Sequence, residues 1–271
     1  MKRFHTIRMV GMLAALVVGL SNSSHATWPS DPTVNLPIAI IPYSRSFPQI
    51  VPDGAGGAIL TWDDGREASV ATDIYAQRVS GAGDILWEVN GISVTNAPRG
   101  QYYPQVVSDG DFGAVIAWTD WRKGTESDIY AQRVDAFGNL LWDSSGVAIC
   151  TAVNDQAWVS MASDGAGGAL IAWEDLRADT SDIYAQRIDG AGTVLWGVDG
   201  VAVCAASWDQ WVPQIMSDGV GGALLAWRTG VAGPRPRTCT RNGSVRTARR
   251  HGRPTAWRSA SWTIGSRPRS L

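Results

Sequence analysis

The stretch that decides the fold is FPQIVPDGAGGAILTW (residues 47–62), because three further copies of it follow. They read YPQVVSDGDFGAVIAW (103–118), WVSMASDGAGGALIAW (158–173) and VPQIMSDGVGGALLAW (212–227). The closing tryptophans, Trp62, Trp118, Trp173 and Trp227, lie 56, 55 and 54 residues apart. Self-similarity at a fixed period of this length indicates one supersecondary unit repeated in tandem, because a single unit cannot bury its apolar surface alone.

Each block carries the signals of four short strands and few signals of a helix. The Asp-Gly turn after the first extended run permits the positive φ that a hairpin needs. The apolar run before each Trp shows little polar alternation, which is typical of a strand covered on both faces. DIYAQR forms the third strand, and GISV, GVAI or GVAV forms the fourth. Four glycine-punctuated strands per block predict an all-β propeller blade, with an open solenoid of small sheets as the alternative.

The chain divides into three parts. Residues 1–26 have the basic start, short apolar stretch and small-residue cleavage pattern of a secretory signal peptide, so we expect export and no membrane span after cleavage. Residues 27–227 hold the repeats. They fall at about 47–101, 102–156 and 157–211, with a partial block at 212–227. Residues 228–271 are predicted to be a frameshifted, disordered tail.

The tail differs from the body in composition. Residues 228–271 contain eleven Arg and no Asp or Glu. A choice of codons that encodes residues 237–243 can be read from the third base as Asp-Met-Tyr-Ala-Gln-Arg, which is the DIYAQR motif with one conservative change. The same offset can yield a Trp twelve codons after that Tyr, the spacing found between Tyr75 and Trp87. We therefore interpret the Arg-rich tail as the product of one base lost near codon 228, rather than as a nucleic-acid or membrane patch.

The ends of the repeat region predict an incomplete propeller. By its spacing to Pro48, the segment 35–39 corresponds to GVAVC before Pro213, so a lone last strand starts the mature chain. In a closed propeller such a strand completes the final blade. The sequence thus predicts three full blades, an orphan N-terminal strand and a C-terminal hairpin. Uncovered sheet edges predict low stability or edge-to-edge association of the chain.

The repeats resemble those of bacterial exported β-propellers of the TolB or a related type. That pattern has Pro, then Pro/Ser-Asp-Gly, an apolar strand, an Arg and an Ile-Tyr strand. The first block matches at Pro48, 52–54, Arg66 and 74–75, and the likeness extends over 47–227. The third block departs from it with Val159 in place of Pro. The resemblance implies a propeller fold and says little about function.

Composition excludes several functions. Between residues 27 and 227 there are nine Lys and Arg against twenty-five Asp and Glu, a balance of −16, which argues against nucleic acid and anionic lipid as partners. All three His lie outside this body, which removes Ser-His-Asp and Cys-His schemes and the usual zinc sites. Cys150 and Cys204 occupy one register in neighbouring blocks, so two buried free thiols are favoured over a disulfide.

Residues that recur in every block are interpreted as structural, because a reaction centre is asymmetric and its groups do not repeat. The Asp-x-Arg triplets at 64–66, 120–122 and 175–177 fit a turn contact better than a ring of Arg for a carboxylate ligand. Calcium is the one cofactor considered, with Asp109 and Asp111 as the best candidate pair. The recurring residues read as structural are Trp62, Trp118, Trp173, Tyr75, Tyr130, Tyr184, Arg78, Arg133 and Arg187.

Aromatic residues that do not recur are the candidates for binding. They are expected mostly in loops before the first strand of a block, where exposed rings are typical of sugar or peptide platforms. The six are Tyr102, Tyr103, Trp121, Trp158, Trp208 and Trp211. The sequence therefore favours a non-enzymatic module that binds a protein or glycan at the cell surface, with no catalytic residue assigned. The alternatives are a glycosidase- or sialidase-like hydrolase, which needs two suitably spaced carboxylates, and a spacer without a ligand.

Overall fold

The structure is a computed structural model that describes residues 28–31, 33–42, 44–66, 71–219, 221–230, 244–250 and 258–262, with backbone alone for the last two ranges. Its described elements are all strands, arranged in four antiparallel sheets of four strands each. The first sheet contains β1 (Arg45–Pro52), β2 (Ala58–Asp64), β3 (Asp73–Val79) and β4 (Ile92–Ser93); the second contains β5 (Gln101–Ser108), β6 (Ala114–Asp120), β7 (Asp128–Val134) and β8 (Val147–Cys150). The third contains β9 (Gln156–Ser163), β10 (Ala169–Asp175), β11 (Asp182–Ile188) and β12 (Val201–Cys204); the fourth contains β13 (Gln210–Ser217), β14 (Ala223–Thr229), β15 (Ser244–Arg250) and β16 (Arg258–Trp262).

Strand order within each sheet follows chain order, as expected for hairpin-linked blades. The register repeats as well: the Trp of the second strand faces the Tyr of the third strand at Trp62–Tyr75, Trp118–Tyr130 and Trp173–Tyr184. The first strand of every sheet has a bulge where it pairs with the second strand. A bulge bends the strand and redirects one side chain, which matters for the site described below.

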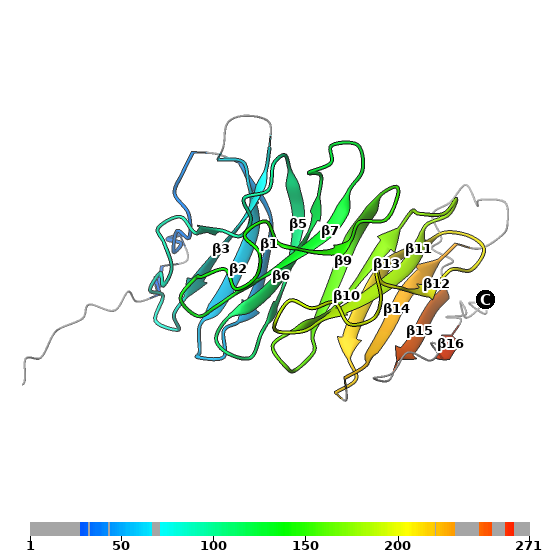
Figure 1. The fold of residues 1–271 in the computed structure, drawn as a ribbon. Coiled ribbons are helices and arrows are strands. Elements are labelled where there is room, and N and C mark those ends of the chain that lie inside the picture. Colours follow the sequence, from blue (N-terminus) through cyan, green and yellow to red (C-terminus); the bar gives the residue numbers. More distant parts are fainter. Residues whose placement is uncertain are drawn as a thin grey trace, which may run out of the picture.

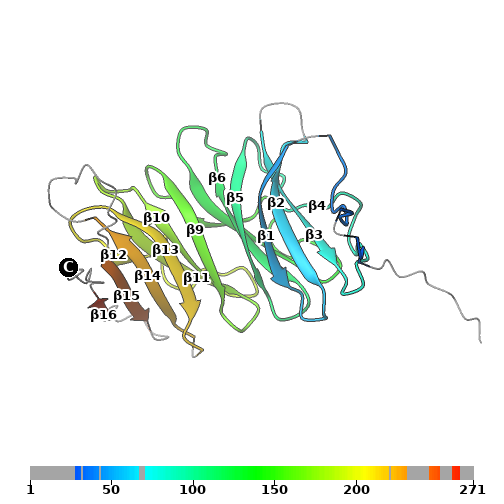
Figure 2. The same ribbon diagram turned by 180° about the vertical axis from the view of Figure 1, so that it is seen from behind.

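The sheets stand side by side in a row, with the first strands β1, β5, β9 and β13 next to one another (Figures 1 and 2). Three apolar clusters fill the spaces between neighbouring sheets. Between the second and third sheets, for example, Val115 and Ala131 meet Ile171 and Trp173. The expected all-β, propeller-type arrangement of four-stranded blades is confirmed, and the row does not close into a ring.

The C-terminal region differs from the expected hairpin and disordered tail. β15 and β16 continue the fourth sheet past β14, pairing residues 244–250 with 223–229 and 258–262 with 245–249. The apolar strand β14 has free backbone groups along its second edge, and a following segment of any composition can satisfy them through main-chain hydrogen bonds. The side chains of β15 and β16 and the frameshift itself remain outside what the structure describes.

The N-terminal part is described from Trp28 onward, so the predicted signal peptide at 1–26 lies outside the described residues. The described residues among 28–42 form no strand, and they run beside the first sheet. In the described part of the chain, no helix has the length and apolar character to cross a membrane. Cys150 and Cys204 are both free, as expected, but only Cys150 is buried and Cys204 is half-buried.

Candidate functional site

Each of the first three sheets has a polar cluster of Trp, Asp, Arg and Tyr at one end of its second strand. In the second sheet, the fully buried Asp120 carboxylate accepts hydrogen bonds from Trp118 Nε1 at 2.8 Å and Arg122 Nη2 at 2.7 Å. The Arg122 guanidinium lies 3.5 Å from the ring centroid of Tyr130 and also donates to Ser145 O at 2.7 Å. Its charge, planar face and donors are thus used inside the sheet.

The first and third sheets repeat this Trp–Asp–Arg–Tyr cluster. Asp64 and Asp175 each accept the indole N–H of Trp62 or Trp173 at 2.8 Å. The Arg cations lie 3.5 Å from the ring centroid of Tyr75 in the first sheet and 3.8 Å from that of Tyr184 in the third sheet. A buried carboxylate that already holds an indole and a guanidinium has no free oxygen for a substrate, so the clusters act as packing elements.

The Arg of each DIYAQR strand joins its own hairpin turn to the next sheet. Arg133 Nε donates to Asp109 Oδ2 at 3.0 Å, and Arg133 Nη1 donates to Gly190 O at 3.0 Å. The other oxygen of Asp109 accepts the backbone N–H groups of Asp111 and Gly113 at 2.8 and 2.9 Å. Arg78 and Arg187 make equivalent ion pairs.

These contacts occupy the carboxylate expected to hold calcium. Both oxygens of Asp109 have partners, and Asp111 approaches it through its backbone N–H rather than its carboxylate. Among the described residues, no group of three or more His, Cys, Asp or Glu side chains is arranged to hold a metal ion.

An exposed line of aromatic side chains crosses the first strands of three sheets. This aromatic row consists of Phe47 on β1, Tyr103 on β5 and Trp158 on β9, with exposed fractions of 50, 36 and 58%. The ring centroids of Phe47 and Tyr103 are 4.6 Å apart in an edge-on arrangement, and those of Tyr103 and Trp158 are 5.7 Å apart and stacked. Because the strands are neighbours, the row forms one apolar strip across the molecule.

The backbone of the aromatic row is strained. Phe47, Tyr103 and Trp158 sit at the strand bulges with φ values of 50°, 57° and 54°. Val212 holds the same place on β13 with φ 52°. Bulky and β-branched residues rarely adopt positive φ, and such strain of about 1–3 kcal/mol per residue is concentrated at functional sites. The bulge turns these side chains out of the sheet and into solvent.

One buried carboxylate holds a residue of this row, and a second holds the corresponding residue of the fourth sheet. Asp63 accepts the backbone N–H of Tyr103 at 3.0 Å, and Glu174 accepts that of Val212 at 2.7 Å. Burial raises the pKa of Asp63 to about 7, against which the Tyr103 hydrogen bond acts only in part. Burial likewise raises the pKa of Glu174. Each carboxyl group follows the repeated Trp, so it connects one sheet to the strained first strand of the next sheet.

The structure separates the six aromatic candidates. Tyr103 and Trp158 meet in the aromatic row, and Tyr102 lies beside Tyr103 with ring centroids 6.1 Å apart. Trp121 follows β6 and is half-buried, while Trp208 and Trp211 belong to the region of the fourth sheet. The Arg228 guanidinium lies 5.3 Å from the ring centroid of Trp211.

The expected loop location of these aromatics needs correction. Tyr102, Tyr103, Trp158 and Trp211 lie inside first strands rather than in loops. A side chain inside a strand can still be exposed here, because a bulge redirects it away from the face that strand alternation would give it. Trp208 does precede its strand.

Sequence reasoning missed Phe47 and Asp63. Phe47, Tyr103, Trp158 and Val212 all stand eleven residues before the Ala that starts the second strand, so comparison by register rather than by residue type could have grouped them. One position directly after the repeated Trp varies among the blocks; it holds Asp63, Thr119, Glu174 or Arg228. The residue that follows it is the Asp of the cluster in the first three blocks and Thr229 in the fourth. A buried position that varies among repeats is a signal of a local role.

Comparison with known proteins gives fold similarity without a family. No protein-family profile matches the chain, and no curated protein matches it in sequence. A protein of unknown function from Dyadobacter fermentans is similar in structure with a TM-score of 0.50 and 9% identity, over 78% of this chain and 67% of that one. An endo-1,4-beta-xylanase from Bacteroides thetaiotaomicron has a TM-score of 0.42 and 9% identity over 82% and 73% of the two chains. An alpha-L-arabinanase from Penicillium chrysogenum has a TM-score of 0.41 and 10% identity over 80% and 76%. At these identities the likeness to the Dyadobacter protein concerns the fold alone, and the resemblance to TolB-type repeats stays a prediction.

Proposed function

We propose that this protein binds an extended glycan along the aromatic row. The observation that carries the proposal is the continuous contact of Phe47, Tyr103 and Trp158, which exposes three rings from three successive sheets in one strip. The C–H groups of a sugar carry partial positive charge and pack on the negative face of an aromatic ring. A row of rings therefore suits several consecutive sugar units rather than one.

The surroundings of the row support glycan binding in two further ways. The positive φ at each ring position fixes the rings before a ligand arrives, so little conformational entropy is lost on binding. The body of the chain carries a balance of −16, which suits a neutral or cationic polysaccharide better than a sulfated or uronic one. Export to the cell surface, as the N-terminal sequence predicts, would bring the protein to such polymers.

Binding to a panel of neutral, acidic and amino-sugar polysaccharides, measured by retardation in affinity gels, tests this function. Trp158→Ala should weaken retention on the preferred neutral or amino-sugar polymer about tenfold, on the order of 1.4 kcal/mol for one lost ring. Phe137→Ala is the matched control, because Phe137 is 83% exposed on the turn after β7 and outside the row. Equal losses in both variants, or retention only on acidic polymers, would contradict the proposal.

A hydrolase is the second candidate function, and Asp63 is the observation that favours it. Its carboxyl group is buried beside Tyr103 with its pKa raised to about 7, as a general acid requires. Glu174, the carboxyl group at the same register of the third sheet, is separated from Asp63 by the whole second sheet. Release of reducing ends from the retained polysaccharide, abolished by Asp63→Asn, would establish hydrolysis; binding without release leaves the non-enzymatic function.

A further inference from the structure

The two ends of the row of sheets expose surfaces that are buried everywhere else. At each internal junction the second strand presents a buried aliphatic residue to the preceding sheet: Ile116, Ile171 or Leu225. The corresponding residue of the first sheet, Leu60, is half-buried. On the first strand, Ile50 is 68% exposed, although its counterparts Val106, Met161 and Ile215 pack into junctions. We call this surface of β1 and β2 the first end face.

At the opposite end of the row, the surface that normally faces a following sheet is uncovered. Ile59, Val115 and Leu170 of the first three sheets are fully buried where they face the following sheet. Their counterpart in the fourth sheet, Leu224, is half-buried. Met216 on β13 is 60% exposed, whereas the equivalent Val107 and Ala162 pack into junctions. This surface of β13 and β14 is the fourth end face.

The N-terminal segment lies on the first sheet as the outer part of an absent preceding sheet would. At internal junctions, the indole N–H of Trp87 or Trp142 donates to a turn carbonyl of the next sheet, Ala136 O at 3.1 Å or Gly190 O at 3.2 Å. In the first sheet the equivalent carbonyl is Gly81 O, and it accepts the indole N–H of Trp28 at 2.8 Å.

A second contact repeats in the same way. Thr151 N, at the end of the second sheet, donates to Asp199 Oδ1 of the third sheet at 2.8 Å. Ile40 N donates to the equivalent residue of the first sheet, Asn90 Oδ1, at 2.9 Å. Two independent junction contacts are therefore formed with the first sheet by a segment that has no sheet of its own among the described residues.

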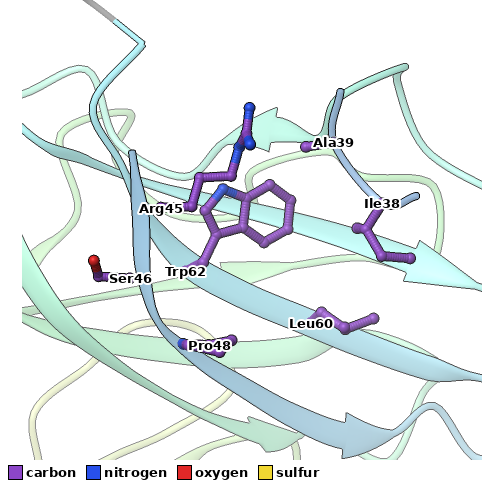
Figure 3. A pocket seen from close by; sticks show the side chains of 7 residues that line it. All are labelled: Ile38, Ala39, Arg45, Ser46, Pro48, Leu60 and Trp62. Carbon is purple, nitrogen blue, oxygen red and sulfur yellow. The ribbon is translucent and has the colours of Figure 1, made fainter. Parts of the chain in front are cut away.

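The space that such a sheet would fill is open. A pocket of about 250 Å³ lies between the N-terminal segment and the first end face, and its lining is mainly apolar. Figure 3 shows Trp62 and Leu60 of β2 on one side and Ile38 and Ala39 of the N-terminal segment on the other. At internal junctions the corresponding space contains the aliphatic side chains of the neighbouring sheet.

We propose that the first end face receives the fourth end face of a second copy of this chain. The two faces are the halves of the junction that the molecule itself forms three times, so their shapes and apolar residues are matched by the repeat. They lie at opposite ends of the row and do not meet within one chain (Figure 1). The N-terminal segment of the receiving copy takes the outer position at the junction, so β16 of the incoming copy is displaced.

Such an interface is heterologous, since it joins different surfaces of the two copies. It leaves one end face open on each terminal copy, so association continues until a ring closes or an open filament forms. An isologous dimer, in which one face meets itself, would stop at two copies. This difference gives the proposal a sharp test.

The test uses two full-length variants with one blocked end each, Ile50→Glu and Met216→Glu. Both side chains are well exposed, so neither change should prevent folding, and Val198→Glu on an outer turn is the control. Sedimentation velocity over a concentration series should show association for the unchanged chain and the control, and monomers for each blocked variant. An equimolar mixture of the two blocked variants should form a dimer and nothing larger, because one open first end face meets one open fourth end face.

Three outcomes would overturn the proposal. The unchanged chain could remain monomeric at all concentrations; the blocked variants could associate alone; or their mixture could remain monomeric while the unchanged chain associates. The last two results would indicate an isologous or edge-to-edge contact instead. Circular dichroism of every variant verifies that the strands are retained.

Discussion

The third and fourth sheets have almost the same sequence from the Ser-Asp-Gly turn to the Trp (163–173 and 217–227) and differ in how they satisfy that buried tryptophan. In the third sheet, Trp173 Nε1 donates to Asp175, which also holds Arg177. In the fourth sheet, Trp227 is equally buried, but Thr229 stands where the Asp should be. Trp227 Nε1 and Thr229 Oγ1 are both buried without a hydrogen-bond partner in the part of the chain that the structure describes.

The comparison shows which part of the repeat packs the sheets together and which part provides the hydrogen-bond acceptor for the buried indole. The apolar strand up to Trp227 is enough to place β13 and β14 against the third sheet, with Leu225 buried in their junction. The residues after the Trp provide the acceptor for its indole. A buried indole N–H without a partner costs about 1–3 kcal/mol, so the fourth sheet has the same outline with a weaker interior.

The largest expected effect is the loss of the acceptor where it exists. Asp175→Ala removes the buried carboxylate to which Arg177 and the Trp173 indole both donate, and should lower the free energy of unfolding by about 3–5 kcal/mol. Thr229→Ala is the matched change in the fourth sheet and should alter it by less than about 1 kcal/mol. Urea denaturation followed by Trp fluorescence measures both. Similar values for the two variants would remove the distinction between the sheets.

The next effect is a gain from restoring the reading frame. If one base was lost near codon 228, a gene with that base replaced encodes an Asp after Trp227 and a DIYAQR-like third strand. The restored chain should be more stable by about 2 kcal/mol, because the indole gains a charged acceptor. Resequencing of the locus tests directly whether a base was lost, and urea denaturation of the restored chain measures the gain in stability. An unbroken run of codons for the printed residues there would end the frameshift interpretation.

A smaller gain is expected from a single neutral acceptor. Thr229→Asn places a carbonyl oxygen near the Trp227 indole and should stabilise the chain by about 1 kcal/mol. Thr229→Val, which has the shape of Thr without an acceptor, is the control for removing the unpaired hydroxyl. The thermal midpoint of each variant is compared with that of the parent. A Val variant as stable as the Asn variant would show that the indole is not the limiting group.

The last effect is a change in pH dependence, which comes from Glu174 at the junction of the two sheets and from Asp63 in the first sheet. Burial raises the pKa of Glu174, so the folded state keeps a proton that the unfolded chain has already lost. Stability from this group is present at low pH and decreases as the pH rises above the normal Glu value of about 4.3. Asp63 should act alike, with its decrease extending to its folded pKa of about 7. Glu174→Gln and Asp63→Asn should each flatten the stability–pH curve; an unchanged slope in both would contradict the burial argument.

How much of the site was predictable differs from residue to residue. Tyr103 and Trp158 could be selected from the sequence because they are large aromatics at a position whose residue type changes from block to block. Phe47 was missed because it looks like the ordinary start of an apolar strand, and only its register relates it to the other two. Its exposure depends on the bulge in β1, which is a property of strand pairing and not of the residue. Asp63 gained its raised pKa from burial under the neighbouring sheet, which no local pattern encodes.

The sequence alone determined the strand order, the four-stranded unit and the structural role of the Asp-x-Arg triplets, because a period near fifty-five residues and turn glycines depend on local chemistry. Tertiary structure decided which side chains lie together and which faces stay exposed. Packing of the first strands side by side brought three separate rings into one row, and the open row left two matching faces uncovered at its ends. The physical reason is that register and turn type are set within a block, whereas exposure depends on whether a neighbouring sheet is present to bury a face.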